Sequence, residues 1–85
     1  MVVEFYTTAC SHCKKLAGAL NKLSEEKGDD VFFGKCNIDQ EALLQSRFDI
    51  SAVPTLLFIK NGEIKNRLVG EVHPLIIQEE IKKLA

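Results

Sequence analysis

Two of the chain's three cysteines, Cys10 and Cys13, are separated only by Ser11 and His12. At this spacing two side chains on a helix lie on the same face. Their α-carbons are then separated by a distance within the roughly 4.4–6.8 Å that a disulfide accepts. Such a pair can close and open without a large movement of the backbone. The spacing therefore favours reversible thiol–disulfide exchange, in which Cys10 attacks as the thiolate and Cys13 resolves the mixed disulfide.

Two other interpretations of these cysteines are less favoured. A pair of buried structural thiols is disfavoured because a turn between a strand and a helix is usually exposed. A metal site could draw on four donors, from Cys10, His12, Cys13 and Cys36. Closed zinc sites more typically combine two paired motifs, and this chain has one. We therefore expect no bound metal.

The cysteine pair lies between two predicted elements. The apolar stretch Val2–Tyr6, interrupted only by Glu4, predicts a strand buried on both faces. A helix is predicted over 11–27, where apolar residues recur at helical spacing, and Gly28 supplies its end. Cys10 then stands at the start of the helix, where unpaired backbone N–H groups and the helix dipole favour a thiolate.

The rest of the chain predicts strands over 31–38, 55–60 and 63–69, a short helix over 40–48 and a last helix from 74 onward. Asp39 can cap the short helix. Asn61-Gly62 predicts a hairpin because both residues accept the positive backbone angles of a two-residue turn. The order of elements indicates a single α/β domain over 1–85, with a four-stranded mixed sheet flanked by three helices.

Composition and charge narrow the function classes. At 46% hydrophobic and 27% charged residues, the 85-residue chain is typical of a soluble globular domain. A net charge of −1 gives no electrostatic case for nucleic acid or for an anionic membrane. No apolar run approaches a membrane span, and no secretion signal is visible at the N-terminus, so we expect a cytoplasmic protein.

Four segments resemble one family, the thioredoxins: "VVEFY", "KCNIDQ", "VPTLLFIKNGE" and "LVGE". The resemblance covers nearly the whole chain and is far more specific than the two cysteines alone. It implies a protein-disulfide oxidoreductase that needs no bound cofactor beyond its redox-active disulfide, Cys10–Cys13. It further implies protein disulfides as substrates, a thioredoxin reductase or similar electron donor, and a monomer.

The resemblance also implies how substrates bind. Val53-Pro54 would be a cis peptide beside the disulfide, and its backbone would pair with the substrate chain. Val53, Pro54 and the Gly70 turn would form the substrate groove together with Ser11. Ala9 belongs to the same surface and stands where the family usually carries tryptophan.

The chain departs from the family's usual pattern in other places. Ser11-His12 replaces glycine and proline, and a histidine there is similar to protein disulfide isomerase. Gly18 replaces a proline that usually kinks the helix. The family's first strand and first helix have no counterpart, which predicts a minimal βαβαββα fold. Strand 31–38 would then form an edge of the sheet.

Glu4 is an acid inside an apolar strand, and such a group must be paired, hydrated or protonated. Lys35, on the neighbouring strand, is its expected partner. The resemblance implies that Glu4 lies beneath Cys13 and relays protons to it, since the family carries a buried aspartate there and a lysine at the position of Lys35.

The sequence is also compatible with two alternative functions. A glutaredoxin-like enzyme would use glutathione, but the turn "GEVHP" lacks the paired glycines and acidic residues that hold glutathione in that family. A thioredoxin-fold binding module would dock partners without turnover, and the two intact cysteines argue against it.

Overall fold

The computed structural model describes residues 1–27 and 31–84, so the predicted helix end at Gly28 lies outside the described residues. The elements follow the predicted order: β1 (Val2–Tyr6), α1 (Ser11–Lys27), β2 (Phe33–Asn37), α2 (Ala42–Arg47), β3 (Thr55–Lys60), β4 (Glu63–Val69) and α3 (Pro74–Leu84). The predicted bounds of β1, α1, β3 and β4 are confirmed.

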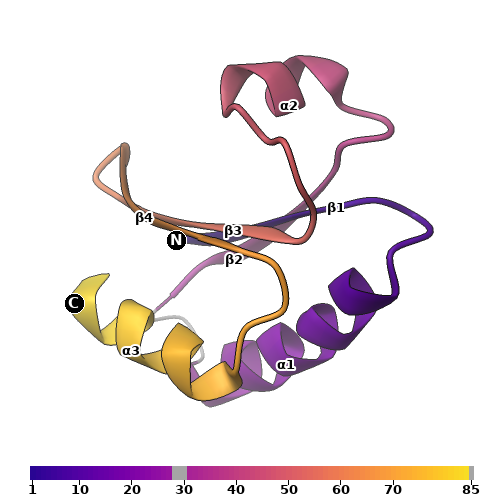
Figure 1. Cartoon of the computed structure of the whole chain (residues 1–85). Coiled ribbons are helices and arrows are strands. Elements are labelled where there is room, and N and C mark those ends of the chain that lie inside the picture. Colours follow the sequence, from indigo (N-terminus) through magenta and orange to yellow (C-terminus); the bar gives the residue numbers. More distant parts are fainter. Residues whose placement is uncertain (28–30, 85) are drawn as a thin grey trace.

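The four strands form one mixed sheet in the order β2-β1-β3-β4. β1 runs parallel to β2 and antiparallel to β3, and β3 runs antiparallel to β4. Helices α1 and α3 cover one face of the sheet, and α2 covers the other (Figure 1). This is the α/β architecture that the sequence predicts.

Each face of the sheet has its own apolar core. On the side of α1 and α3, Val2 and Phe58 of the sheet pack with Leu20 of α1 and Ile77 of α3. On the side of α2, the cluster contains Phe5, Cys36, Ile50 and Leu57. β1 and β3 contribute to both clusters because alternate side chains of a strand point to opposite faces.

The buried residues of α1 explain its position. They are Cys13, Leu16, Leu20 and Leu23, which recur at intervals of three and four and so form one stripe along the helix. This stripe fixes the rotation of α1 against the sheet. Cys13 belongs to it, so the same packing that holds the helix also buries one of the two cysteines.

The hairpin between β3 and β4 turns at Asn61-Gly62, as predicted. Asn61 has φ 54° and Gly62 has φ 78°. Two successive positive angles are typical of the tight turn that joins twisted antiparallel strands. Between Phe58 and Ile59 the register with β4 shifts by a bulge or similar irregularity.

Two details around β2 and α2 differ from the sequence prediction. β2 covers only Phe33–Asn37 rather than 31–38. The N-cap of α2 is Glu41, without a side-chain hydrogen bond, so the predicted cap at Asp39 is wrong. The Asp39 carboxylate instead accepts a hydrogen bond from the Thr8 backbone N–H, 3.2 Å away. It therefore orders the segment before the cysteines, which sequence spacing alone cannot reveal.

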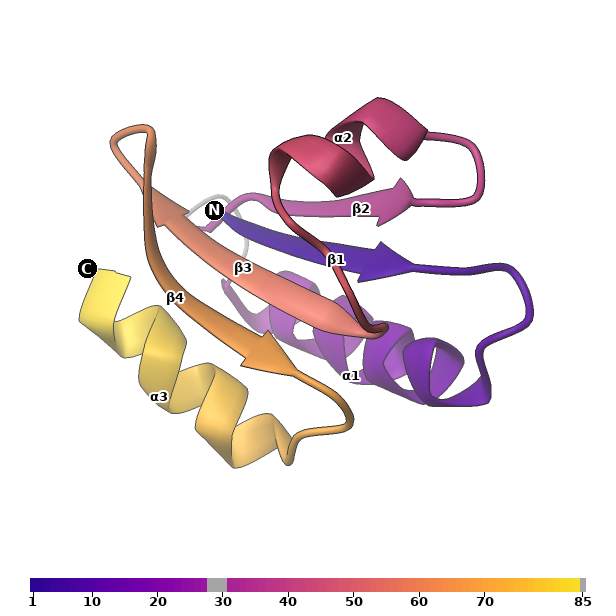
Figure 2. The same cartoon turned by 45° about the horizontal axis from the view of Figure 1, so that its top comes forward.

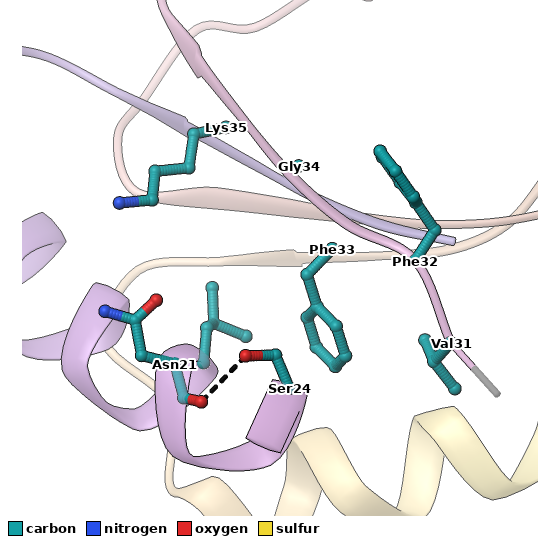
Figure 3. Close-up of a pocket in the computed structure, with 8 residues that line it drawn as sticks. Asn21, Ser24, Val31, Phe32, Phe33, Gly34 and Lys35 are labelled. Carbon is teal, nitrogen blue, oxygen red and sulfur yellow. Dashed lines mark hydrogen bonds between the residues drawn. The ribbon is translucent and has the colours of Figure 1, made fainter. Parts of the chain in front are cut away.

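β2 forms one edge of the sheet, as predicted from the resemblance. A groove of about 350 Å³ is lined by residues of α1 and of this strand with the segment before it. Figure 3 shows these residues. The Phe33 side chain points into the groove toward α1, whereas Phe32 points to the other side and is 67% exposed. The Phe32 carbonyl accepts a hydrogen bond from Val2 at 2.8 Å. Because backbone groups alternate along a strand, those of Phe33 and Lys35 face the open edge.

Within the described residues, no helix has the length and apolar character needed to cross a membrane.

Candidate active site

Cys10 and Cys13 form a disulfide at the N-terminus of α1, with their α-carbons 5.2 Å apart. The Cys13 backbone N–H donates to the Cys10 sulfur at 3.1 Å. Cys13 is 2% exposed, whereas Cys10 is only partly buried. The two sulfurs therefore differ in access: an approaching molecule can reach Cys10, and Cys13 lies behind it.

The segment between β1 and α1 is held to the end of β2. The Asn37 side-chain amide donates to the Thr8 hydroxyl at 3.1 Å, and the Thr8 N–H donates to Asp39. The side-chain Oδ1 of Asn37 accepts a hydrogen bond from the Asp39 backbone N–H at 2.9 Å. These bonds fix the turn just before Cys10, so the reactive sulfur lies on an ordered support.

The loops before β3 and after β4, which hold Val53, Pro54 and Gly70, lie at the same end of the sheet as the loop between β1 and α1 (Figure 2). The Val53-Pro54 peptide is cis, as the resemblance implied. Phe5 pairs with Thr55, so Pro54 lies level with the end of β1. The Gly70 N–H donates to the Pro54 carbonyl at 2.8 Å, which places the turn after β4 beside this proline.

The remaining two groove residues lie next to the cysteines. Ala9 and Ser11 flank Cys10, and both are exposed. Val53 is partly buried. The turn at Gly70 has φ 89°, a left-handed angle that favours glycine. All five predicted groove residues therefore belong to the three segments that meet at this end of the sheet.

Glu4 is buried, with 1% of its surface exposed. Burial raises the pKa of its carboxyl from 4.5 to about 7, and the positive charge of Lys35 opposes that rise. Within the described part of the chain its Oε2 atom has no hydrogen-bond partner. A cavity of about 240 Å³ is lined by Glu4, Cys13 and Lys35, so the structure brings these three predicted site residues together.

The expected ion pair between Glu4 and Lys35 does not form. The two residues are direct neighbours across β1 and β2. Lys35 is nevertheless exposed, and no ion pair to Glu4 occurs among residues 1–27 and 31–84. The ammonium group stays in water because burying it beside the carboxylate would cost desolvation of both charges. Lys35 therefore affects Glu4 only by the electrostatic effect of its positive charge, which lowers the pKa of the carboxyl.

His12 makes a contact that sequence analysis did not identify. Its Nδ1 lies 2.9 Å from Oε2 of Glu71, a residue 59 positions later in the chain. His12 is 59% exposed and Glu71 is 47% exposed. The only hint in the sequence is that Glu71 follows Gly70 directly, in a turn expected near the disulfide.

Cys36 does not join the other two cysteines. It is buried on the face of the sheet that α2 covers, and burial raises the pKa of its thiol. Cys13 packs on the opposite face with the stripe of α1. In the described ranges, no three histidine, cysteine, aspartate or glutamate side chains gather where they could hold a metal ion.

Comparison with known proteins agrees with this geometry. The family model for thioredoxin matches residues 1–83. The chain belongs to the thioredoxin family. Thioredoxin-1 of Saccharomyces cerevisiae is 36% identical over 81 residues, which cover 95% of this chain and 77% of that protein. The M-type chloroplastic thioredoxin of spinach is 30% identical over 83 residues.

The relatives differ in how much of their own length this chain spans. The match covers 98% of this chain but only 46% of the spinach protein and 48% of its pea counterpart. The chain thus spans about half the length of these two curated relatives. Mouse mitochondrial thioredoxin is 34% identical to this chain, and the match covers 51% of the mouse protein.

Solved structures show the same fold. Oxidised mitochondrial thioredoxin 3 from S. cerevisiae has a TM-score of 0.88 and 31% identity, over 98% of this chain and 76% of that one. A second structure, with a TM-score of 0.89, 30% identity and the same coverage, comes from work on thiol resolution in a yeast mitochondrial 1-Cys peroxiredoxin through the glutathione and thioredoxin systems. The predicted family and fold are both confirmed.

Proposed function

We propose that this protein is a thiol–disulfide oxidoreductase that reduces or exchanges disulfides in other proteins. The observation that carries the proposal is the asymmetric disulfide at the start of α1, with accessible Cys10 and buried Cys13. Family membership and the cis peptide at Pro54 support it. A thiolate at Cys10 gains from the unpaired N–H groups and dipole of the helix N-terminus.

In the reduced protein, the Cys10 thiolate attacks one sulfur of a substrate disulfide. A bond forms between Cys10 and that sulfur, and the other substrate sulfur leaves as a thiolate. Cys13 then loses its proton and attacks Cys10, which closes the Cys10–Cys13 disulfide and releases the second substrate thiol. Two electrons thus pass from the dithiol to the substrate.

Glu4 is proposed to accept the Cys13 proton in the second step. Its carboxyl shares a cavity with Cys13, and burial raises its pKa to about 7, close to the pH at which such a transfer must occur. The unpartnered Oε2 leaves one oxygen available for that proton. The positive charge of Lys35 lowers the pKa of the Glu4 carboxyl. The cavity gives water a route to this group.

The substrate chain is proposed to lie across Val53, Pro54 and Gly70, and Ala9 and Ser11, which flank Cys10, complete the same groove. A reductase or similar dithiol donor then restores the dithiol, and no cofactor is bound apart from the redox-active disulfide. The proposal places the protein in the reducing cytoplasm as a monomer. Fractionation of cells with an antibody to the protein tests the location.

The test is reduction of a model protein disulfide, with thioredoxin reductase and glutathione compared as electron sources. We expect turnover with the reductase and little with glutathione. Cys13→Ser should accumulate mixed disulfides through Cys10, and Cys10→Ser should accumulate none. Turnover with glutathione alone would favour a glutaredoxin-like enzyme. Full activity of Cys10→Ser, or substrate binding without turnover, would contradict the proposal.

A further inference from the structure

The contact between His12 and Glu71 connects two segments that flank Cys10. His12 is the second residue of α1, and Glu71 lies in the turn between β4 and α3. Their side chains meet at 2.9 Å between Nδ1 and Oε2. Cys10 precedes His12 by two positions in the chain, and Gly70 directly precedes Glu71. The pair therefore lies at the edge of the surface where a substrate disulfide must approach.

The chemistry of the two groups fixes where the histidine proton is. An ionised carboxylate only accepts hydrogen bonds, so Nδ1 of His12 must carry the hydrogen that it donates to Glu71. In the neutral ring this leaves Nε2 unprotonated, and in the charged ring the pair becomes an ion pair. In both forms the carboxylate holds the ring by its Nδ1 side.

The other titratable groups near His12 make no comparable contact. Lys14 and Lys15 follow it on α1 and are exposed. His73, in the turn that precedes α3, uses its own Nδ1 to accept the Leu75 backbone N–H at 3.1 Å. Among the described residues, Glu71 alone forms an ion pair with His12.

We propose that Glu71 is a positioning residue that holds His12 in its Nδ1-protonated form and offsets the charge of the imidazole, so that His12 stabilises the Cys10 thiolate less than an unpaired histidine would. The inference rests on the proposed function only in taking Cys10 as the reacting thiol. A positive ring two positions along the chain from Cys10 lowers the free energy of the thiolate, and a carboxylate bound to that ring cancels part of its potential. Glu71 thus moderates the reactivity that the histidine confers.

The first test compares four reduced proteins: the wild type, Glu71→Gln, His12→Gln and the double variant. The alkylation rate of Cys10 is measured at about pH 6, toward the acid end of the range in which histidine side chains in general change charge. We expect His12→Gln to slow the reaction more in the Glu71→Gln background than in the wild type. The coupling energies of exposed ion pairs correspond to about a 1.4- to fivefold difference between the two effects on the rate.

Glu79→Gln is the matched control, because Glu79 is an exposed acid on α3 and its loss changes the net charge by the same amount. It should leave the effect of His12→Gln unchanged. An equal effect of His12→Gln in the wild-type and Glu71→Gln backgrounds would overturn the proposal. A smaller effect in the Glu71→Gln background would also overturn it, since Glu71 would then support the histidine rather than moderate it.

The second test reads the ring directly through the ¹⁵N chemical shifts of the His12 imidazole. In the oxidised wild type at a pH where the ring is neutral, we expect the hydrogen on Nδ1. In Glu71→Gln we expect it to move toward Nε2, whereas Glu79→Gln should resemble the wild type. The same tautomer in all three proteins would refute the positioning role.

These measurements separate the inference from the proposed function. Neither the imidazole shifts nor the alkylation rates require turnover of a protein substrate. If the protein fails to reduce disulfides but the tautomer moves in Glu71→Gln, only the proposed function fails. If the protein is active and the tautomer does not move, only the role of Glu71 fails.

Discussion

Replacing Glu4 by glutamine should change how stability depends on pH. The carboxyl ionises at its ordinary value of 4.5 in the unfolded chain, and burial raises its pKa to about 7 in the fold. Between these two values the folded protein binds the proton more tightly than the unfolded chain does. The stabilisation is therefore fully present below about pH 4.5 and is lost as the pH rises through about 7.

The size of the change in the free energy of unfolding follows from the difference between the two pKa values. At about 1.36 kcal/mol for each pH unit, the free energy of unfolding should fall by up to about 3 kcal/mol over this interval. Glutamine has nearly the shape of the protonated acid and cannot ionise. Glu4→Gln should therefore match the wild type at acid pH and exceed its stability by up to about 3 kcal/mol above neutrality.

Urea unfolding of the oxidised proteins between about pH 4 and 8 measures this directly, as the difference between the wild type and Glu4→Gln. Taking the difference cancels the titration of all other groups. Glu79→Gln, at an exposed position, should show no such trend. A difference that does not vary with pH would refute the reasoning. A wild type that gains stability relative to Glu4→Gln as the pH rises would mean that Lys35 and not burial controls the carboxyl.

Three further predictions concern the site, the edge and the core. We expect the reduction potential of the wild type to lie between the roughly −270 mV of thioredoxin and the roughly −180 mV of protein disulfide isomerase. His12→Pro should lower this potential, and equilibration against glutathione buffers measures it. Sedimentation at micromolar and millimolar concentrations should show a monomer, and self-association abolished by Phe32→Lys would instead locate a dimer at the β2 edge. Leu20→Ala should lower the free energy of unfolding by about 2–5 kcal/mol because Leu20 is buried. Leu43→Ala, at a leucine that is 86% exposed, should change it by less than about 0.5 kcal/mol in the same urea titration.

Much of the fold could be predicted because its signals are local. The leucines of α1 recur at helical spacing, and Asn61-Gly62 satisfies a turn geometry that few other pairs accept. The position of Cys10 followed from these neighbours, since a thiol between a strand and a helix must stand at the helix N-terminus. These features depend on residues close together in the chain.

The contacts that could not be predicted join distant segments. His12 meets Glu71 across 59 positions, and Thr8 meets Asp39 across 31. Periodicity says nothing about such pairs, because they depend on how two loops approach and which rotamers they take. For Lys35, the pairing of its strand with that of Glu4 was predicted correctly. The position of its side chain was not, because hydration of the ammonium group keeps it exposed to solvent.

The arrangement of the sheet also provides an attachment point that lies away from the active-site disulfide. The described ends of the chain and the Asn61-Gly62 turn lie at the opposite end of the sheet from the start of α1 (Figure 1). Met1 is joined to Ile59, next to that turn, by a hydrogen bond of 2.9 Å from its amino group. A surface anchor, a fluorescent label or a fused protein attached there leaves Cys10 facing outward. Electrochemical or single-molecule experiments can therefore address the disulfide in an oriented protein.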